Sequence, residues 1–230
     1  MPNLAENEDD FQQFEKMECS NTFRAQNQLI LEMTFDPNSK FLALGTTDSQ
    51  IKIYDVVNGF QTHNFMGHRG IILGLQFYPD KDSLKLLSTA EDFVIKVWDL
   101  VLKREVAVLK PKGKDDNMAH RTTAMIFTKD KKTLITSGRD GCIHFWNVHD
   151  NWKLTSSIKV SSLGALPFEE ILQMEYIQIG NDPCLLLGGQ TGELSVYSIK
   201  RQQIVFKATE SRQLSVLAET DEEPTNTSEI

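Results

Sequence analysis

Short runs of alternating apolar and polar residues cover most of the chain, and turn residues separate them. Val94, Lys96 and Trp98, for example, stand two positions apart in one such run. Short β-rich runs bounded by Gly, Pro, Asp or Asn are typical of antiparallel strands. Helical periodicity is absent over most of the 230 residues. The pattern therefore predicts an all-β protein.

The strand pattern recurs four times. In each copy a turn residue precedes an aromatic residue by six positions, and the four pairs are Asp48 with Tyr54, Asp92 with Trp98, Asp140 with Trp146, and Thr191 with Tyr197. The turn positions are 44, 48 and 51 residues apart, as expected if insertions collect in surface loops. A unit of this length with four short strands is typical of a β-propeller blade.

The second and third copies carry the fullest motifs. The second opens with Gly67-His68 and closes with Trp98-Asp99, and we expect its strands at 71–77, 84–89, 94–98 and 104–109. The third has His120 and Trp146 at the matching positions. This Gly-His to Trp-Asp pattern resembles that of WD-repeat proteins, which implies a propeller of four-stranded blades.

Charge divides the chain into three regions. Residues 1–18 and 209–230 each hold six acidic side chains against one basic side chain, a net charge of −5 apiece. The overall charge of −8 then leaves +2 for residues 19–208. We expect disordered acidic ends around a propeller segment whose blades are centred on 29–66, 67–109, 118–160 and 171–208.

Four blades are at the low end of the usual propeller range. The first copy also has Arg24-Ala25-Gln26 where a Gly-His opening would stand. We therefore expect a partial or open ring, either a segment of a longer protein or one that a partner completes. Such a ring would expose strand edges, so weak cooperativity and low solubility are expected.

The sequence gives no sign of a metal site, a cofactor site or a membrane span. Cys19, Cys142 and Cys184 are widely spaced, which fits a reducing compartment and argues against a disulfide framework or a zinc site. The pairs His63 with His68 and His144 with His149 lack a third ligand. No run approaches the ~20 apolar residues of a membrane helix. We expect a soluble intracellular protein with no cofactor, no metal and no small-molecule substrate.

Histidine, a hydroxyl residue and aspartate recur with tryptophan in the two middle copies, and this composition is also that of a hydrolase site. The two sets are His68, Ser88, Asp92 and Trp98, and His120, Thr136, Asp140 and Trp146. Repetition in successive blades argues against catalysis, and the WD-repeat resemblance implies a buried hydrogen-bond chain that stiffens each blade. No catalytic residue is predicted. The outer copies have Leu44 or Leu187 and Tyr54 or Tyr197 instead, so apolar packing should hold those blades.

Two further sets are candidate contacts. Residues that follow a signature residue or enter a turn are free to face a protein partner, and these are Arg69, Phe93, Arg121 and Arg139. A basic cluster could touch an RNA backbone, and it comprises Lys103, Arg104, Lys110, Lys112 and Lys114. Asp115 and Asp116 close that loop and no aromatic residues interleave, so a solvated loop is the better interpretation.

A narrower resemblance covers roughly residues 24–208. The runs Phe35-Asp36-Pro37, Phe65-Met66-Gly67-His68-Arg69-Gly70-Ile71 and Thr136-Ser137-Gly138-Arg139-Asp140-Gly141, with the linker Gly164-Ala165-Leu166-Pro167-Phe168-Glu169-Glu170-Ile171, are similar to the first propeller of the transducin-beta-like nucleolar proteins. That resemblance implies a WD-repeat subunit of the small-subunit processome, in the nucleolus and nucleus. Its partners would be other WD-repeat proteins of a large ribonucleoprotein complex, with precursor ribosomal RNA and small nucleolar RNA contacted indirectly. The opening blades, second propeller and C-terminal region of that family have no counterpart in the sequence.

The leading hypothesis is thus a non-enzymatic scaffold in ribosomal small-subunit biogenesis. The alternatives are a WD-repeat adaptor of a ubiquitin-ligase or signalling complex, which would place it in the cytoplasm, and a propeller that binds RNA directly.

Overall fold

The computed structural model describes residues 28–110, 121–160, 170–190 and 192–208, and these residues form sixteen β-strands. The first eight are β1 (Ile30–Phe35), β2 (Phe41–Thr46), β3 (Gln50–Asp55), β4 (Gln61–Met66), β5 (Ile72–Phe77), β6 (Lys85–Ala90), β7 (Ile95–Asp99) and β8 (Arg104–Leu109). The second eight are β9 (Thr122–Phe127), β10 (Thr133–Gly138), β11 (Cys142–Asn147), β12 (Lys153–Lys159), β13 (Ile171–Ile179), β14 (Asp182–Gly189), β15 (Leu194–Ser198) and β16 (Gln203–Ala208).

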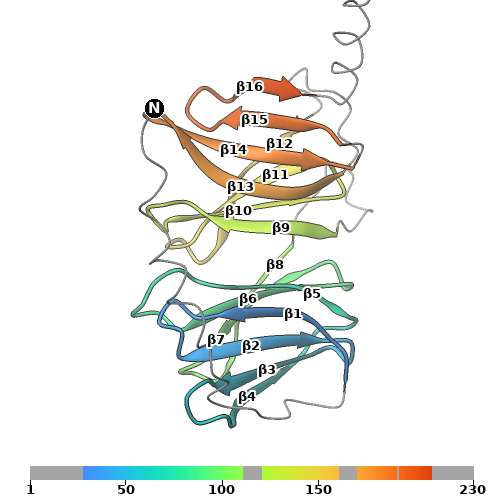
Figure 1. Cartoon of the computed structure of the whole chain (residues 1–230), viewed down its shortest axis with the longest axis vertical. Helices are drawn as coiled ribbons and strands as arrows, with labels where there is room; N and C mark the ends of the chain where they lie inside the picture. The colour runs from blue at the N-terminus through green and yellow to red at the C-terminus, as the bar shows by residue number, and fades with distance from the viewer. Residues whose placement is uncertain (1–27, 111–120, 161–169, 191, 209–230) are drawn as a thin grey trace, which may run out of the picture.

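Strands consecutive in the sequence pair antiparallel to give four separate sheets, β1–β4, β5–β8, β9–β12 and β13–β16. Short turns join neighbouring strands, and such turns favour antiparallel pairing of consecutive strands. In Figure 1 the blue and green strands of the first two sheets fill the lower half of the long axis, and the yellow and orange strands of the last two sheets fill the upper half. The expectation of an all-β chain with four blades of four antiparallel strands is confirmed.

The first strand of each sheet lies on the inner side of the assembly. Contacts between sheets join β1 to β5, β5 to β9, and β9 to β13. Within the described ranges the series does not close, because contacts between first strands join each blade to the next but do not join β13 to β1 to a similar extent. The four blades therefore form an open ring, as the sequence predicted.

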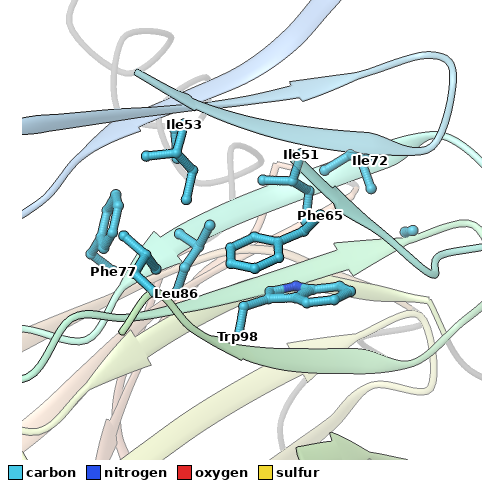
Figure 2. Close-up of a cluster of buried hydrophobic side chains, with 10 residues drawn as sticks. Ile51, Ile53, Phe65, Ile72, Phe77, Leu86 and Trp98 are labelled. Carbon is cyan, nitrogen blue, oxygen red and sulfur yellow. The ribbon is translucent and has the colours of Figure 1, made fainter. Parts of the chain in front are cut away.

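Apolar side chains between successive blades form the core. Between the first two blades, Ile51 and Phe65 meet Ile72, Leu86 and Trp98. Figure 2 shows these side chains converging in the space between the two sheets, and the rings of Phe65 and Trp98 stack with centroids 5.0 Å apart. Similar clusters lie between the second and third blades and between the third and fourth. These clusters bury the facing surfaces of each pair of successive blades.

Candidate functional site

A chain of hydrogen bonds crosses the second blade. The indole N–H of Trp98 donates to Ser88 Oγ over 2.7 Å, and Ser88 Oγ lies 2.7 Å from His68 Nε2. His68 Nδ1 lies 2.9 Å from the nearer carboxylate oxygen of Asp92. Because Ser88 accepts from Trp98, its own proton is directed to His68 Nε2, and Nδ1–H then donates to Asp92. The structure thus brings together the four residues that the sequence singled out in this copy.

The protonation state of His68 agrees with this direction of donation. Burial lowers the pKa of His68, and its contact with Asp92 offsets part of that effect, so the imidazole is neutral near pH 7. His68 is 7% exposed and Ser88 is fully buried. A serine nucleophile must reach its substrate, and Ser88 is sealed in the blade with its oxygen already bonded on two sides. The arrangement fits a role in holding the blade together.

The third blade has a hydroxyl group at the equivalent position, on Thr136, and adds a histidine that the sequence analysis did not select for this network. Trp146 Nε1–H donates to Thr136 Oγ1 over 3.0 Å. Asp140 Oδ2 lies 3.0 Å from Nε2 of His144, whose Nδ1 lies 2.7 Å from Ser157 Oγ. His144 faces Thr136 across the β10–β11 pair and is buried. The predicted partner His120 lies outside the described residues.

The outer blades replace these polar groups with buried apolar and phenolic side chains. Leu187 and Tyr197 belong to the cluster between the third and fourth blades. Leu44 and Tyr54 in the first blade are 3% and 4% exposed. All four side chains therefore lie in the interior, at positions where we expected apolar packing from the sequence.

One left-handed residue marks the turn between the second and third strands of every blade. These residues are Ser49 (φ 64°), Phe93 (φ 61°), Gly141 (φ 63°) and Gly192 (φ 80°). Glycine adopts this conformation freely and serine at moderate cost, but a bulky side chain there is strained. Phe93 is also 40% exposed. A large apolar side chain held outward on strained backbone marks this turn as a contact position.

The candidate arginines lie at the same end of the blades as this turn. The backbone N–H of Arg69 donates to Asp92 Oδ2 over 2.9 Å, which places Arg69 beside Phe93. In the third blade, the Arg139 N–H donates to the Arg121 carbonyl over 3.1 Å. A Cβ at Gly138 would lie 2.3 Å from that carbonyl, so only glycine lets these two segments approach.

Arg121 and Arg139 line a shallow cleft of about 250 Å³ between the second, third and fourth blades. The Arg139 side chain is 53% exposed and its Nε lies 3.1 Å from Glu170 Oε1. The other lining residues are Leu73, Thr122, Thr123 and Leu172. The cleft combines two guanidinium groups with two leucines. We name the loop-end surface formed by Arg69, Phe93, Arg121 and Arg139 the loop face.

A larger cavity of about 590 Å³ lies where the inner strands converge, and residues of β1, β5, β9 and β13 line it. Glu32 and Glu175 are its acidic residues. Burial raises the pKa of Glu32. This cavity is the central channel of the open ring.

The predicted basic cluster is only partly visible. Lys103, Arg104 and Lys110 are exposed around β8, while Lys112 and Lys114 lie outside the described residues. Lys131 Nζ in the third blade lies 3.4 Å from Asp80 Oδ1 in the second. RNA contact by this cluster stays a prediction.

Two searches for other kinds of site found no candidate in the part of the chain that the structure describes. No three His, Cys, Asp or Glu side chains gather there as a metal site. No helix there is long and apolar enough to span a bilayer. Cys142 and Cys184 are not joined in a disulfide, and Cys184 is buried.

Comparison with known proteins agrees with this fold. Residues 116–147 match the family described as WD domain, G-beta repeat, and residues 15–80 match the anaphase-promoting complex subunit 4 WD40 domain. Together with the four-stranded blades and the network from His68 to Trp98, these matches define the class: the chain is a WD-repeat protein.

Among individual relatives, the chain is similar to transducin beta-like protein 3. The rat protein is 30% identical over 184 residues, 77% of this chain and 22% of the relative. The cattle protein is 36% identical over 121 residues, 52% of this chain and 14% of the relative. Human WD repeat and SOCS box-containing protein 1 is 30% identical over 114 residues, 50% of this chain and 26% of the relative. The chain thus spans about a quarter or less of the length of these relatives.

Proposed function

We propose that this chain is a non-enzymatic WD-repeat scaffold of ribosomal small-subunit biogenesis, which acts in the nucleolus by holding neighbouring proteins of the small-subunit processome. The observation that carries the proposal is the similarity to transducin beta-like protein 3, which extends over 77% of the chain in the rat relative. The sequence runs around Phe35, Phe65 and Thr136, which resemble those of the nucleolar family, also support the proposal. Precursor ribosomal RNA and small nucleolar RNA are indirect partners.

The loop face supplies the physical means of holding a partner. Because the scaffold is rigid, its loops present side chains to a partner without the scaffold having to become ordered on binding. Affinity at such surfaces comes from a few aromatic and arginine anchors. Phe93 is an exposed aromatic residue, and Arg69 and Arg139 are exposed guanidinium groups. Arg139 is already oriented by Glu170. We propose that these three, with Arg121, are the anchors.

The test is affinity purification of the tagged full chain from nuclear extract, with sequencing of the RNA that accompanies it. We expect enrichment of the 5′ external spacer of the ribosomal RNA precursor together with a box C/D small nucleolar RNA. Absence of both, with a cytoplasmic set of protein partners, would overturn the nucleolar assignment and leave the WD-repeat fold untouched.

Variants of the loop face test the anchors separately. Phe93→Gly combined with Arg139→Ala should reduce recovery of the complex by at least about tenfold. Lys200→Ala is the matched control, because Lys200 is an exposed cation in the turn between β15 and β16, at the opposite end of the blades. Equal recovery with the double variant and with the control would exclude the loop face as the contact surface.

A second candidate is an adaptor in a ubiquitin-ligase complex. It is favoured by the similarity to WD repeat and SOCS box-containing protein 1 over half of the chain and by the match of residues 15–80 to the anaphase-promoting complex subunit 4 WD40 domain. Recovery of a cullin in place of preribosomal particles would support this function against the first.

A further inference from the structure

An exposed apolar ridge crosses the first two blades at the end that lies opposite the loop face. In the first blade it consists of Val57 and Phe60, in the turn between β3 and β4, which are 77% and 55% exposed. In the second blade it consists of Val101 and Leu102, in the turn between β7 and β8, which are 74% and 55% exposed. Single exposed apolar side chains are common, but neighbouring ones mark interaction sites. We call these four residues the turn ridge.

The two turns of the ridge lie side by side. His63 Nε2 on β4 lies 2.8 Å from the carbonyl oxygen of Leu100, the residue that begins the β7–β8 turn. The Leu100 side chain is buried in the cluster between the first two blades. Phe60 stands three positions before His63, and its carbonyl accepts from the Asp55 N–H over 3.0 Å. The contact between β4 and the β7–β8 turn therefore brings the apolar side chains of both turns to one surface.

The exposure of the ridge does not depend on which blades adjoin the first and fourth ones. The second blade packs against a described blade on each side, yet Val101 in its turn remains 74% exposed. The third and fourth blades carry His149 and Lys200 at the position of Val57 and Val101, two residues after the third strand. Apolar residues at this position are thus a property of the first two blades, and the packing of blades does not require them.

Cations flank the ridge, and the carboxylates of its two turns are already bonded. Asp99 Oδ1 accepts from the backbone N–H of Leu102 over 2.9 Å, and Asp55 Oδ1 accepts from a backbone N–H of its own turn over 2.9 Å. Lys103 and Arg104 follow Leu102 directly and are exposed. Among the residues that the structure describes, neither takes part in an ion pair. The surface therefore fits a ligand that carries both apolar side chains and carboxylates.

The first eighteen residues of the chain have this chemistry. Their net charge is −5, and Phe11, Phe14 and Met17 recur among them at three-residue spacing. They precede the first blade, whose turn forms half of the ridge. Residues 209–230 carry the same net charge, but they contain no aromatic residue and follow the fourth blade. The first segment is therefore the better match in composition and in position.

The connecting segment is long enough for this contact. The Leu29 carbonyl accepts from the Thr47 N–H over 3.2 Å, which places the start of the first blade at the loop-face end. Residues 19–28 reach up to about 35 Å when extended. A strand of six residues such as β1 is only about 20 Å long. The segment can therefore pass along the first blade to its opposite end.

From these features we infer that residues 1–18 dock on the turn ridge, with their apolar side chains on the four ridge residues and their carboxylates beside Lys103 and Arg104. Apolar burial and the attraction between opposite charges both favour this contact. The inference is independent of the proposed function, which uses the loop face at the other end of the blades. Failure of the test below would leave that proposal unchanged.

The test uses a fluorescently labelled peptide of residues 1–18 as the probe and fluorescence anisotropy as the readout. Its receptor is the full chain in which the acidic residues of the first segment are changed to amides, so that the tethered segment does not compete. These changes are Glu6→Gln, Glu8→Gln, Asp9→Asn, Asp10→Asn, Glu15→Gln and Glu18→Gln. We expect saturable binding of one peptide per chain, which weakens as salt concentration rises.

Two variants of this receptor locate the site. Leu102→Ser removes an apolar ridge residue and Arg104→Glu reverses a flanking charge, and each should raise the dissociation constant at least about fivefold. Val205→Ser and Lys200→Glu are the matched controls, at exposed positions of the fourth blade, and should leave binding unchanged. All four side chains are exposed, so thermal unfolding should match that of the receptor.

The wild-type chain tests whether the tethered segment occupies the ridge. It should bind the labelled peptide at least about tenfold more weakly than the receptor with amides, because a tethered segment competes at a high effective concentration. Wild-type chain that binds the peptide as tightly as this receptor would overturn the inference. So would a receptor that shows no saturable binding, or ridge variants that bind like their controls.

Discussion

The Ser88 hydroxyl links two buried side chains of the second blade, His68 and Trp98, whose rings also meet edge to face with centroids 6.1 Å apart. It lies 2.7 Å from both His68 Nε2 and Trp98 Nε1. Removing it leaves a buried donor and a buried acceptor unpaired, which costs more than the loss of an average hydrogen bond. The residue therefore matters for the stability of the blade and not for chemistry at an external substrate.

We expect Ser88→Ala to lower the free energy of unfolding by about 1–3 kcal/mol, because the desolvation of its two partners is no longer offset. Urea unfolding followed by tryptophan fluorescence measures the change. Ser156→Ala, at an exposed position on β12, is the control and should change stability by less than about 0.5 kcal/mol. Equal effects of the two substitutions would contradict the bridging role of Ser88.

Two histidines with lowered pKa values predict how the free energy of unfolding depends on pH. Burial lowers the pKa of His68 and of His63, whose Nε2 lies 2.8 Å from the Leu100 carbonyl. Below the ordinary histidine pKa of about 6.5, the unfolded chain binds protons that the folded chain does not. The free energy of unfolding should therefore decrease as pH falls below that value.

Urea unfolding at a series of pH values measures this slope. His63→Gln should reduce the slope, because one of the two imidazoles with a lowered pKa is gone. His149→Gln changes an exposed position and should leave it as in the wild type. An unchanged slope in His63→Gln would show that this histidine does not contribute.

At the scale of the strand and the sheet, position in the register decides what a residue contributes. Phe127 and Phe35 hold the same register position at the end of the first strand of their blades, yet Phe127 contacts the second blade and Phe35 is 53% exposed. Both follow a methionine by two positions, at Met125 and Met33. The difference comes from whether a neighbouring blade covers the sheet.

Phe127→Ala should destabilise the chain by about 3–5 kcal/mol, since it opens a cavity between two blades. Phe35→Ala should cost less than about 1 kcal/mol, because Phe35 is 53% exposed and little buried area is lost. Thermal and chemical unfolding of the two variants side by side measures the contrast. A loss at Phe35 as large as at Phe127 would mean that the Phe35 side chain is buried in solution.

The strand pattern and the repeat spacing were sufficient to predict the blades, because period-two alternation and turn residues are local signals. The expected second-blade strands differ from the observed ones by at most one or two residues at the ends. His144 was missed as a buried partner of Asp140, because it stands on β11 where the second blade has Lys96 and no local signal marks a buried histidine. The left-handed backbone at Phe93 was also missed, since only the fold around the turn imposes it.

At the scale of the whole molecule, stability is expected to be unequal along the chain. The second and third blades each pack against a neighbouring blade on both faces, while the first and fourth each pack against one described blade. In arrays whose units contact only their neighbours, stability is approximately a sum of unit terms and interface terms. The end blades therefore have fewer stabilising terms than the middle ones.

Hydrogen exchange of the dilute chain should show this order. Backbone amides of β1–β4 and β13–β16 should exchange faster than those of β5–β12 at matched hydrogen-bonded positions. Uniform protection in dilute protein would show that the four blades unfold as one unit.

The repetition of one blade pattern also bears on how such a gene changes over time. Successive blades meet through the same kind of apolar contact between facing sheets, so each junction is built in a similar way. Duplication or loss of a segment that encodes one whole blade, about 45 residues long by the repeat length, would therefore leave every remaining junction complementary. Lineages can thus vary the number of units while keeping each unit's sequence, and the length of the protein becomes easier to change than its core.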